Sequence, residues 1–149
     1  MQRDKSRKHH YRREMCQRLS LPMLDTPATS YIGALEARRE IEMRFEATLA
    51  EFGANAFYAT PTILRTAPRV PTDLDDQDAL LDEMRKGIYN TALFNMTHQP
   101  AVSVPNGMGA NELPTALQIT GRLWEDAAVL QLAHAYQTVT PFHLGRPPL

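Results

Sequence analysis

Apolar residues recur at helical spacing in the first half of the chain, and charged residues fill the positions between them. This period of about 3.6 residues predicts an amphipathic helix over residues 27–52, which Thr26 can cap and Gly53 can end. Two further helices are expected near residues 76–93 and 125–138. Helices should therefore account for much of the regular structure.

Short runs of β-branched and small residues lie between these helices. Strands are expected at residues 56–59, 101–104 and 116–120, the first buried on both faces and the second closed by Pro105. A turn containing glycine and asparagine should reverse the chain between the last two strands, which can then pair. The pattern favours an α/β fold with short strands of a mixed central sheet packed by helices.

One long segment carries a family resemblance. It reads FNMTHQPAVSVPNGMGANELPTALQITGR, and the helical run WEDAAVLQLAHAYQ follows it. This segment resembles the carboxyl-terminal signature of the amidase signature family, and the resemblance extends back to about residue 25. It implies that residues 25–149 are the carboxyl-terminal part of an amidase domain. The residues in common include Phe94, Asn95, Thr97, Pro100, Ser103, Val104, Pro105, Gly107, Leu113, Pro114, Leu117, Gln118, Gly121 and Arg122.

Four positions depart from the family pattern. His98, Glu112 and Ala116 stand where the family usually has glycine, and Asn106 stands at a usual cysteine. A β-carbon is unwelcome wherever such a glycine adopts positive φ, so strained backbone is expected at those sites. His98 lies in a segment that approaches the substrate pocket in the family. It is either a specificity residue of a complete enzyme or a product of sequence drift.

Enzymes of this family act through a serine nucleophile, a second serine in a cis peptide and a lysine, which a Gly/Ser-rich run carries. This chain has no such run, and none of its serines has a glycine neighbour. A serine hydroxyl needs an adjacent base and an oxyanion site before it can attack an amide. The resemblance therefore implies a truncated amidase signature protein, related to amide hydrolases, that has no catalytic residue of its own and is inactive alone.

Asn95, Thr97 and Thr60 are the candidate substrate-binding residues, because their amide and hydroxyl groups can donate and accept hydrogen bonds at a pocket. The alternative for Asn95 and Thr97 is that they only hold the turn before Pro100. No metal or cofactor is expected. The histidines lack the spacing of a zinc site, and the aspartates between residues 73 and 78 lack the glycine and distal glutamate of a calcium loop.

The net charge of −1 is unevenly distributed, since residues 1–18 hold seven Lys or Arg against two acidic residues. Residues 1–24 are expected to form a basic amino-terminal arm or a severed helix. A solvated segment is favoured over a nucleic-acid contact. The chain has no apolar run of membrane-spanning length, and its single Cys16 rules out an internal disulfide, so a cytoplasmic location is expected.

Three functional hypotheses remain open. The chain is one part of a split amidase, whose amino-terminal fragment supplies the catalytic serines and lysine for a small amide substrate. It is otherwise a non-catalytic protein-interaction module, including a homo-oligomer, or an unstable product with neither partner nor cooperative unfolding. The first two hypotheses share a physical expectation, which is an apolar sheet edge or face left uncovered.

Overall fold

The computed structural model describes residues 25–69 and 77–145, so the predicted basic segment 1–24 lies outside the described residues. The chain divides into two compact units, residues 1–38 and 39–149. In the first unit, the described residues contribute the start of helix α2 (Ala28–Glu51), which confirms the helix expected over residues 27–52. The second unit holds the remainder of α2 and β1 (Tyr58–Pro61), α3 (Gln77–Ile88), α4 (Ala92–Thr97), β2 (Ala101–Met108), η1 (Ala110–Glu112), β3 (Pro114–Thr120), α5 (Asp126–Val139) and η2 (Phe142–Leu144).

The described strands form one antiparallel sheet in the order β1-β3-β2. Strands β2 and β3 pair from Ala101 opposite Thr120 to Met108 opposite Pro114, as the sequence predicted for these two runs. Strand β1 pairs with the other side of β3, with Tyr58 opposite Thr120. The α/β class is confirmed.

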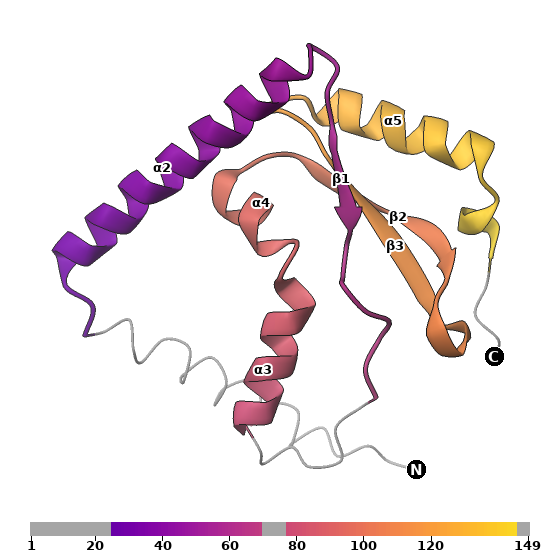
Figure 1. Ribbon diagram of the computed structural model, residues 1–149, viewed down its shortest axis with the longest axis horizontal. Helices are drawn as coiled ribbons and strands as arrows, with labels where there is room; N and C mark the ends of the chain where they lie inside the picture. Colours follow the sequence, from indigo (N-terminus) through magenta and orange to yellow (C-terminus); the bar gives the residue numbers. More distant parts are fainter. Residues whose placement is uncertain (1–24, 70–76, 146–149) are drawn as a thin grey trace. The chain divides into compact units, whose positions relative to one another are not determined.

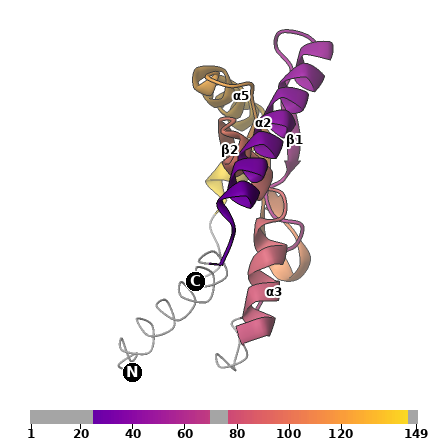
Figure 2. The same ribbon diagram turned by 90° about the vertical axis from the view of Figure 1, so that its left-hand side faces the viewer.

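Helix α5 covers one face of this sheet, where it packs against β2 and β3; Figure 1 shows it beside these two strands, and Figure 2 shows it next to β2. The core here consists of Val104, Ile119 and Ala133, with Val102 and Leu117 packed against it. These strand residues alternate with Ser103 and Gln118, so the latter pair points to the opposite face. The opposite face is therefore polar at its centre.

An aromatic cluster packs at one end of the polar face. The ring of Tyr58 on β1 contacts Phe45 on α2 and Phe94 on α4, at centroid distances of 5.9 and 5.8 Å. Phe45 and Phe94 meet edge to face at 5.3 Å. This cluster holds the second half of α2 and the short helix α4 beside β1.

The boundaries of two strands differ from the prediction. β1 begins at Tyr58 rather than at residue 56, and it is an edge strand with three of its four residues exposed, not a strand buried on both faces. β2 does not end before Pro105 but continues to Met108. Proline is tolerated because β2 is the other edge of the described sheet, where one side of the strand needs no N–H donor.

The helix expected near residues 76–93 is divided into α3 and α4. α3 ends at Ile88, whose carbonyl accepts hydrogen bonds from both the backbone N–H and the hydroxyl of Thr91, at 3.0 and 3.2 Å. The side chain of Asn90 instead donates to the carbonyl of Pro61, at 2.6 Å. Asn90 thus ties the chain to β1 directly after α3 ends.

Two of the departures from the family pattern fall at strained backbone positions. His98 has φ 64° and Glu112 has φ 55°, both in the left-handed region that favours glycine. Ala116, the third substitution at a usual glycine, lies within β3 and has no positive φ. The expected strain is therefore present at two of the three positions.

Large apolar side chains remain exposed over the described parts of the second unit. Within residues 25–69 and 77–145, no helix combines the length and the apolar character needed to cross a bilayer. No group of three metal-ligating side chains was found in the same residues. The most exposed apolar residues include Trp124, Phe52, Val139, Tyr89, Leu144 and Leu64.

Candidate functional site

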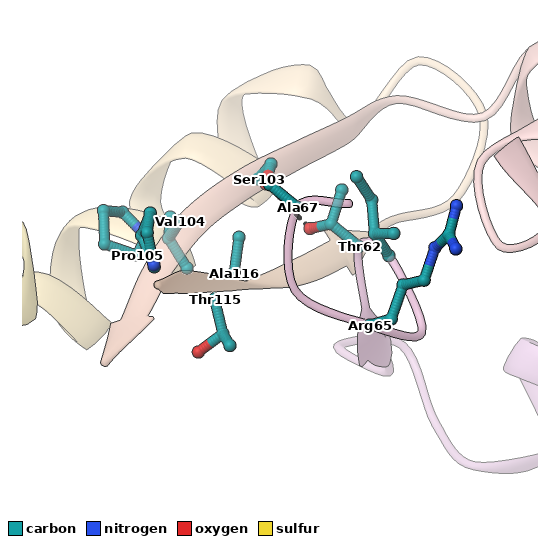
Figure 3. Close-up of a pocket in the computed structure, with 10 residues that line it drawn as sticks. Thr62, Arg65, Ala67, Ser103, Val104, Pro105, Thr115 and Ala116 are labelled. Atoms are coloured by element: carbon teal, nitrogen blue, oxygen red, sulfur yellow. Dashed lines mark hydrogen bonds between the residues drawn. The ribbon is translucent and has the colours of Figure 1, made fainter. Parts of the chain in front are cut away.

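A pocket of about 400 Å³ opens between the segment after β1, the middle of β2 and the start of β3. Figure 3 shows Val104 and Pro105 at one end of this pocket and Arg65 at the other. Its size suits a small organic molecule. The lining residues are Thr62, Ile63, Arg65, Ala67, Ser103, Val104, Pro105, Pro114, Thr115 and Ala116.

A pair of hydroxyl groups forms the polar centre of the pocket. Oγ1 of Thr62 and Oγ of Ser103 lie 2.7 Å apart and share a hydrogen bond (Figure 3). Thr62 is positioned by its own backbone N–H, which donates to the carbonyl of Ala116 at 2.9 Å and prolongs the sheet beyond β1. The pair can donate to and accept from a bound carbonyl or amide.

Ser103 has no base beside it. Its described side-chain partner is another hydroxyl, and none of the residues that line the pocket is a histidine, lysine or carboxylate. A serine hydroxyl without a proton acceptor is a poor nucleophile. The pocket can thus bind and orient an amide, but its described residues do not assemble a nucleophile with a base.

Arg65 provides the only positive charge among the lining residues. Its Nη2 pairs with Oε2 of Glu83 on α3 at 2.5 Å, while its buried Nε has no hydrogen-bond partner among the described residues. The hydrogen bond from Arg65 lowers the pKa of the Glu83 carboxyl, and the same bond raises the pKa of Arg65. The pair ties the segment after β1 to α3, and the unpaired Nε is buried and not presented to the pocket.

The three predicted binding residues do not come together in this pocket. Thr60 lies on the polar sheet face next to it, half-buried, and its hydroxyl accepts a hydrogen bond from Asn90 Nδ2 at 3.2 Å. Thr97 is fully buried, and its hydroxyl contacts the Leu93 carbonyl at 2.9 Å and the side-chain amide of Gln99. Asn95 is exposed on α4. Thr97 therefore has a structural role in ending α4.

Asn90 is a residue that the sequence reasoning missed. Its side-chain nitrogen Nδ2 donates to Thr60 Oγ1 and to the carbonyl of Pro61, and its backbone carbonyl accepts a hydrogen bond from Gln118 Nε2 at 3.3 Å. It thereby connects the turn between α3 and α4 with the two strands β1 and β3. The available signal was an asparagine inside a predicted helix, a residue type that favours turns and caps over helix interiors.

Comparison with known proteins shows the family to which this chain belongs. The family model described as Amidase matches residues 3–130 of the chain. Two relatives are the A subunits of glutamyl-tRNA(Gln) amidotransferase from Acinetobacter baylyi, 33% identical over 78% of this chain, and from Ralstonia nicotianae, 36% identical over 78%. The chain spans 22% of the length of each of these relatives.

A solved structure has the same fold over most of the chain. The crystal structure of the glutamyl-tRNA(Gln) amidotransferase A subunit from Thermotoga maritima superposes with a TM-score of 0.66 at 27% identity, covering 90% of this chain and 27% of that protein. The match reaches further toward the amino terminus than the resemblance from residue 25, since the family model begins at residue 3. This chain belongs to the Amidase family and corresponds to about a quarter of the length of these longer relatives.

Proposed function

We propose that this chain forms the carboxyl-terminal part of an amide hydrolase, that it supplies one wall of the substrate pocket, and that another polypeptide segment supplies the nucleophile and its base. One observation carries this proposal. The hydroxyl of Ser103 faces the hydroxyl of Thr62, and the described residues that line this pocket include no histidine, lysine or carboxylate that could serve as the base of a nucleophile. The chain alone should therefore bind an amide weakly and leave it intact.

The substrate wall would be the polar face of the sheet. Ser103 and Thr62 place hydroxyl groups in the pocket, Arg65 also lines it, and Thr60 adjoins it. Donors of this kind fix the orientation of a carbonyl in a mostly apolar pocket. Asn95, exposed on α4, is proposed as a second contact that operates only when the missing segment covers this face.

The test is an amide-hydrolysis assay with the chain alone and with a complementary fragment. The fragment is the amidotransferase A subunit from Acinetobacter baylyi without the region that matches this chain. We expect hydrolysis and a higher melting temperature only in the mixture, because burial of the exposed apolar side chains stabilises both parts. Hydrolysis by the chain alone that disappears in Ser103→Ala would overturn the proposal.

The roles of the predicted residues can be separated within the same mixture. Thr60→Val keeps the shape of the side chain and removes its hydroxyl, and Asn95→Ala removes the amide. Each should raise KM more than it lowers kcat, because these groups bind substrate without entering the chemical step. Thr138→Val serves as the matched control. It removes an exposed hydroxyl on α5, the helix that covers the opposite face of the sheet.

A protein-interaction module is the second candidate. The observation that favours it is the exposure of large apolar side chains such as Trp124, at 91%, and Tyr89, at 72%. A module of this kind predicts no amide hydrolysis by the chain alone or by the mixture with the complementary fragment. Inactivity in the mixture, together with a single cooperative transition of the chain alone, would favour the module, including assembly with a second copy of this chain.

A further inference from the structure

A second cavity, of about 420 Å³, lies in the second unit and shares no lining residue with the pocket described above. It forms where the latter part of α2, the end of α4 and the start of α5 meet. Its lining differs in character from that of the first pocket, since it combines an indole, an imidazole and two carboxylates. The residues are Glu42, His98, Pro100, Leu123, Trp124 and Asp126.

Trp124 is displayed to solvent by a backbone that is held in place. It is the single tryptophan of the chain, its exposed fraction is 91%, and its φ of 67° lies in the left-handed region. A bulky residue adopts this conformation only when its surroundings impose it. The indole is thus presented at the cavity instead of packing into the core.

The carboxylate of Glu46 anchors the two residues before Trp124. Its Oε1 accepts from the N–H of Leu123 at 2.8 Å, and its Oε2 accepts from Nε of Arg122 at 3.1 Å. On the carboxyl-terminal side of Trp124, the backbone N–H of Glu125 donates to the carbonyl of Arg122 at 3.1 Å. Both neighbours of Trp124 are therefore anchored.

The cavity is negatively charged. Glu42 and Asp126 contribute carboxylates from two different helices, and no Lys or Arg is among the described residues that line it. His98 lies close to Glu42, with 3.3 Å between Nδ1 and Oε2. The nearby guanidinium of Arg122 is already paired with Glu46. No lysine or arginine thus pairs with these two carboxylates among the described residues that line the cavity.

We propose that this cavity binds a guanidinium group, carried either by a free small molecule or by an arginine side chain of a polypeptide. A guanidinium is planar and weakly hydrated, so it stacks on an indole face and at the same time pairs with a carboxylate through two N–H groups. An ammonium group is compact and strongly hydrated and uses this combination less well. The inference uses none of the residues of the amide pocket and concerns the chain alone, in which Trp124 is exposed.

The first experiment is a titration of the whole chain with L-argininamide, in which the fluorescence of Trp124 reports binding. Because the chain has a single tryptophan, the signal comes from the cavity itself. L-citrullinamide, which has the same shape and a neutral urea group, is the matched probe. We expect saturable binding of argininamide and at least about tenfold weaker binding of citrullinamide, since a charge-assisted pair is worth about that factor.

Two source arms accompany this titration. A short peptide with one internal arginine is compared with the same peptide carrying lysine. Saturable binding of free argininamide supports the site, and saturable binding of the arginine peptide alone assigns it to a polypeptide partner. A linear, non-saturating loss of fluorescence with every probe is collisional quenching of an exposed indole and overturns the proposal.

Substitutions locate the binding. Glu42→Gln and Asp126→Asn each remove one charge with little change of shape, and each should weaken argininamide binding about tenfold. Glu40→Gln is the matched control, because Glu40 lies on the same helix, pairs with Arg44 and lies outside the cavity. Trp124→Phe should also weaken argininamide binding, which calorimetry measures because this variant has no tryptophan. Unchanged affinity in Glu42→Gln and Asp126→Asn, with circular dichroism showing an intact fold, would refute the site.

Discussion

The carboxylate of Glu46 on α2 binds the side chain of Arg122, which lies 76 positions further along the chain, with 3.1 Å between Oε2 and Nε. The same carboxylate accepts the backbone N–H of Leu123, so one side chain holds the segment between β3 and α5 from two sides. The side chains of Glu46 and Arg122 are 20% and 34% exposed, so solvent screens this pair less than a surface pair.

Replacement of Glu46 should therefore destabilise the protein. We expect Glu46→Gln to lower the free energy of unfolding by about 1–3 kcal/mol, because the amide has one accepting oxygen and no charge, so either Arg122 Nε or the N–H of Leu123 loses its acceptor. Urea denaturation measures this change. Glu40→Gln breaks an exposed pair on the same helix and should cost at most about 0.5 kcal/mol. Equal effects of the two substitutions would contradict the role given to Glu46.

Gly121 is required for close packing between the end of β3 and α5. A β-carbon at this position would lie 2.5 Å from Cγ2 of Val129. Gly121→Ala should therefore destabilise the fold by about 1–3 kcal/mol through overpacking. Gly87 is the control, because a β-carbon there meets nothing within 4 Å, and Gly87→Ala in helix α3 should stabilise by up to about 1 kcal/mol. Thermal unfolding of both variants should shift the melting temperature in opposite directions.

Glu112 offers a stabilising substitution. Its φ of 55° is strained for any residue with a β-carbon, and the side chain is exposed. Glu112→Gly should raise the free energy of unfolding by roughly 0.5–1 kcal/mol, because the relief of left-handed strain exceeds the entropy gained by the unfolded chain. Glu112→Ala keeps the β-carbon and should give no such gain. A gain of the same size in both variants would point to the loss of the charge instead.

The pair of Arg65 and Glu83 should make stability depend on pH. The hydrogen bond from Arg65 lowers the pKa of Glu83 in the folded state, so its contribution is fully present above the ordinary carboxyl pKa. That contribution is lost as pH falls through the lowered folded-state pKa. Urea midpoints measured from about pH 7 to about pH 3 should fall less steeply in Glu83→Gln than in the original chain.

Asp82 sets the control for this experiment. Its pKa is also lowered, by the hydrogen bond from Lys86, but both groups lie on α3 and are more than half exposed. Asp82→Asn should therefore change the slope less than Glu83→Gln does. Parallel curves for Glu83→Gln and the original chain would show that Glu83 is equally acidic in the folded and unfolded states.

Local patterns in the sequence were sufficient for the long helix and the antiparallel strand pair. The helix over Ala28–Glu51 follows from helical spacing between a capping threonine and a glycine, and the pairing of β2 with β3 follows from two short runs around one turn. The amidase resemblance rested on a continuous motif, and the family match confirms it. Each of these inferences uses residues that are near one another in the chain.

Less of the candidate site was accessible in this way. The structure puts the predicted residue Thr60 beside the pocket. The lining residues Thr62, Arg65 and Ser103 come together only because the segment after β1 lies beside β2 and β3. Thr97 was selected for a hydroxyl that proves to be buried within the fold. Residue type alone cannot distinguish a polar group that faces a cavity from one that satisfies a neighbouring carbonyl.

By itself, then, the sequence determined the family, the α/β class and the segments that follow a regular period, since these depend on local spacing and on a contiguous motif. The tertiary structure decided where α3 stops, which groups line the two cavities and why Trp124 is exposed. The reason is physical. Asn90 with Thr60 and Glu46 with Arg122 are hydrogen-bonded across 30 and 76 positions, and only the folded chain brings such donors and acceptors within reach.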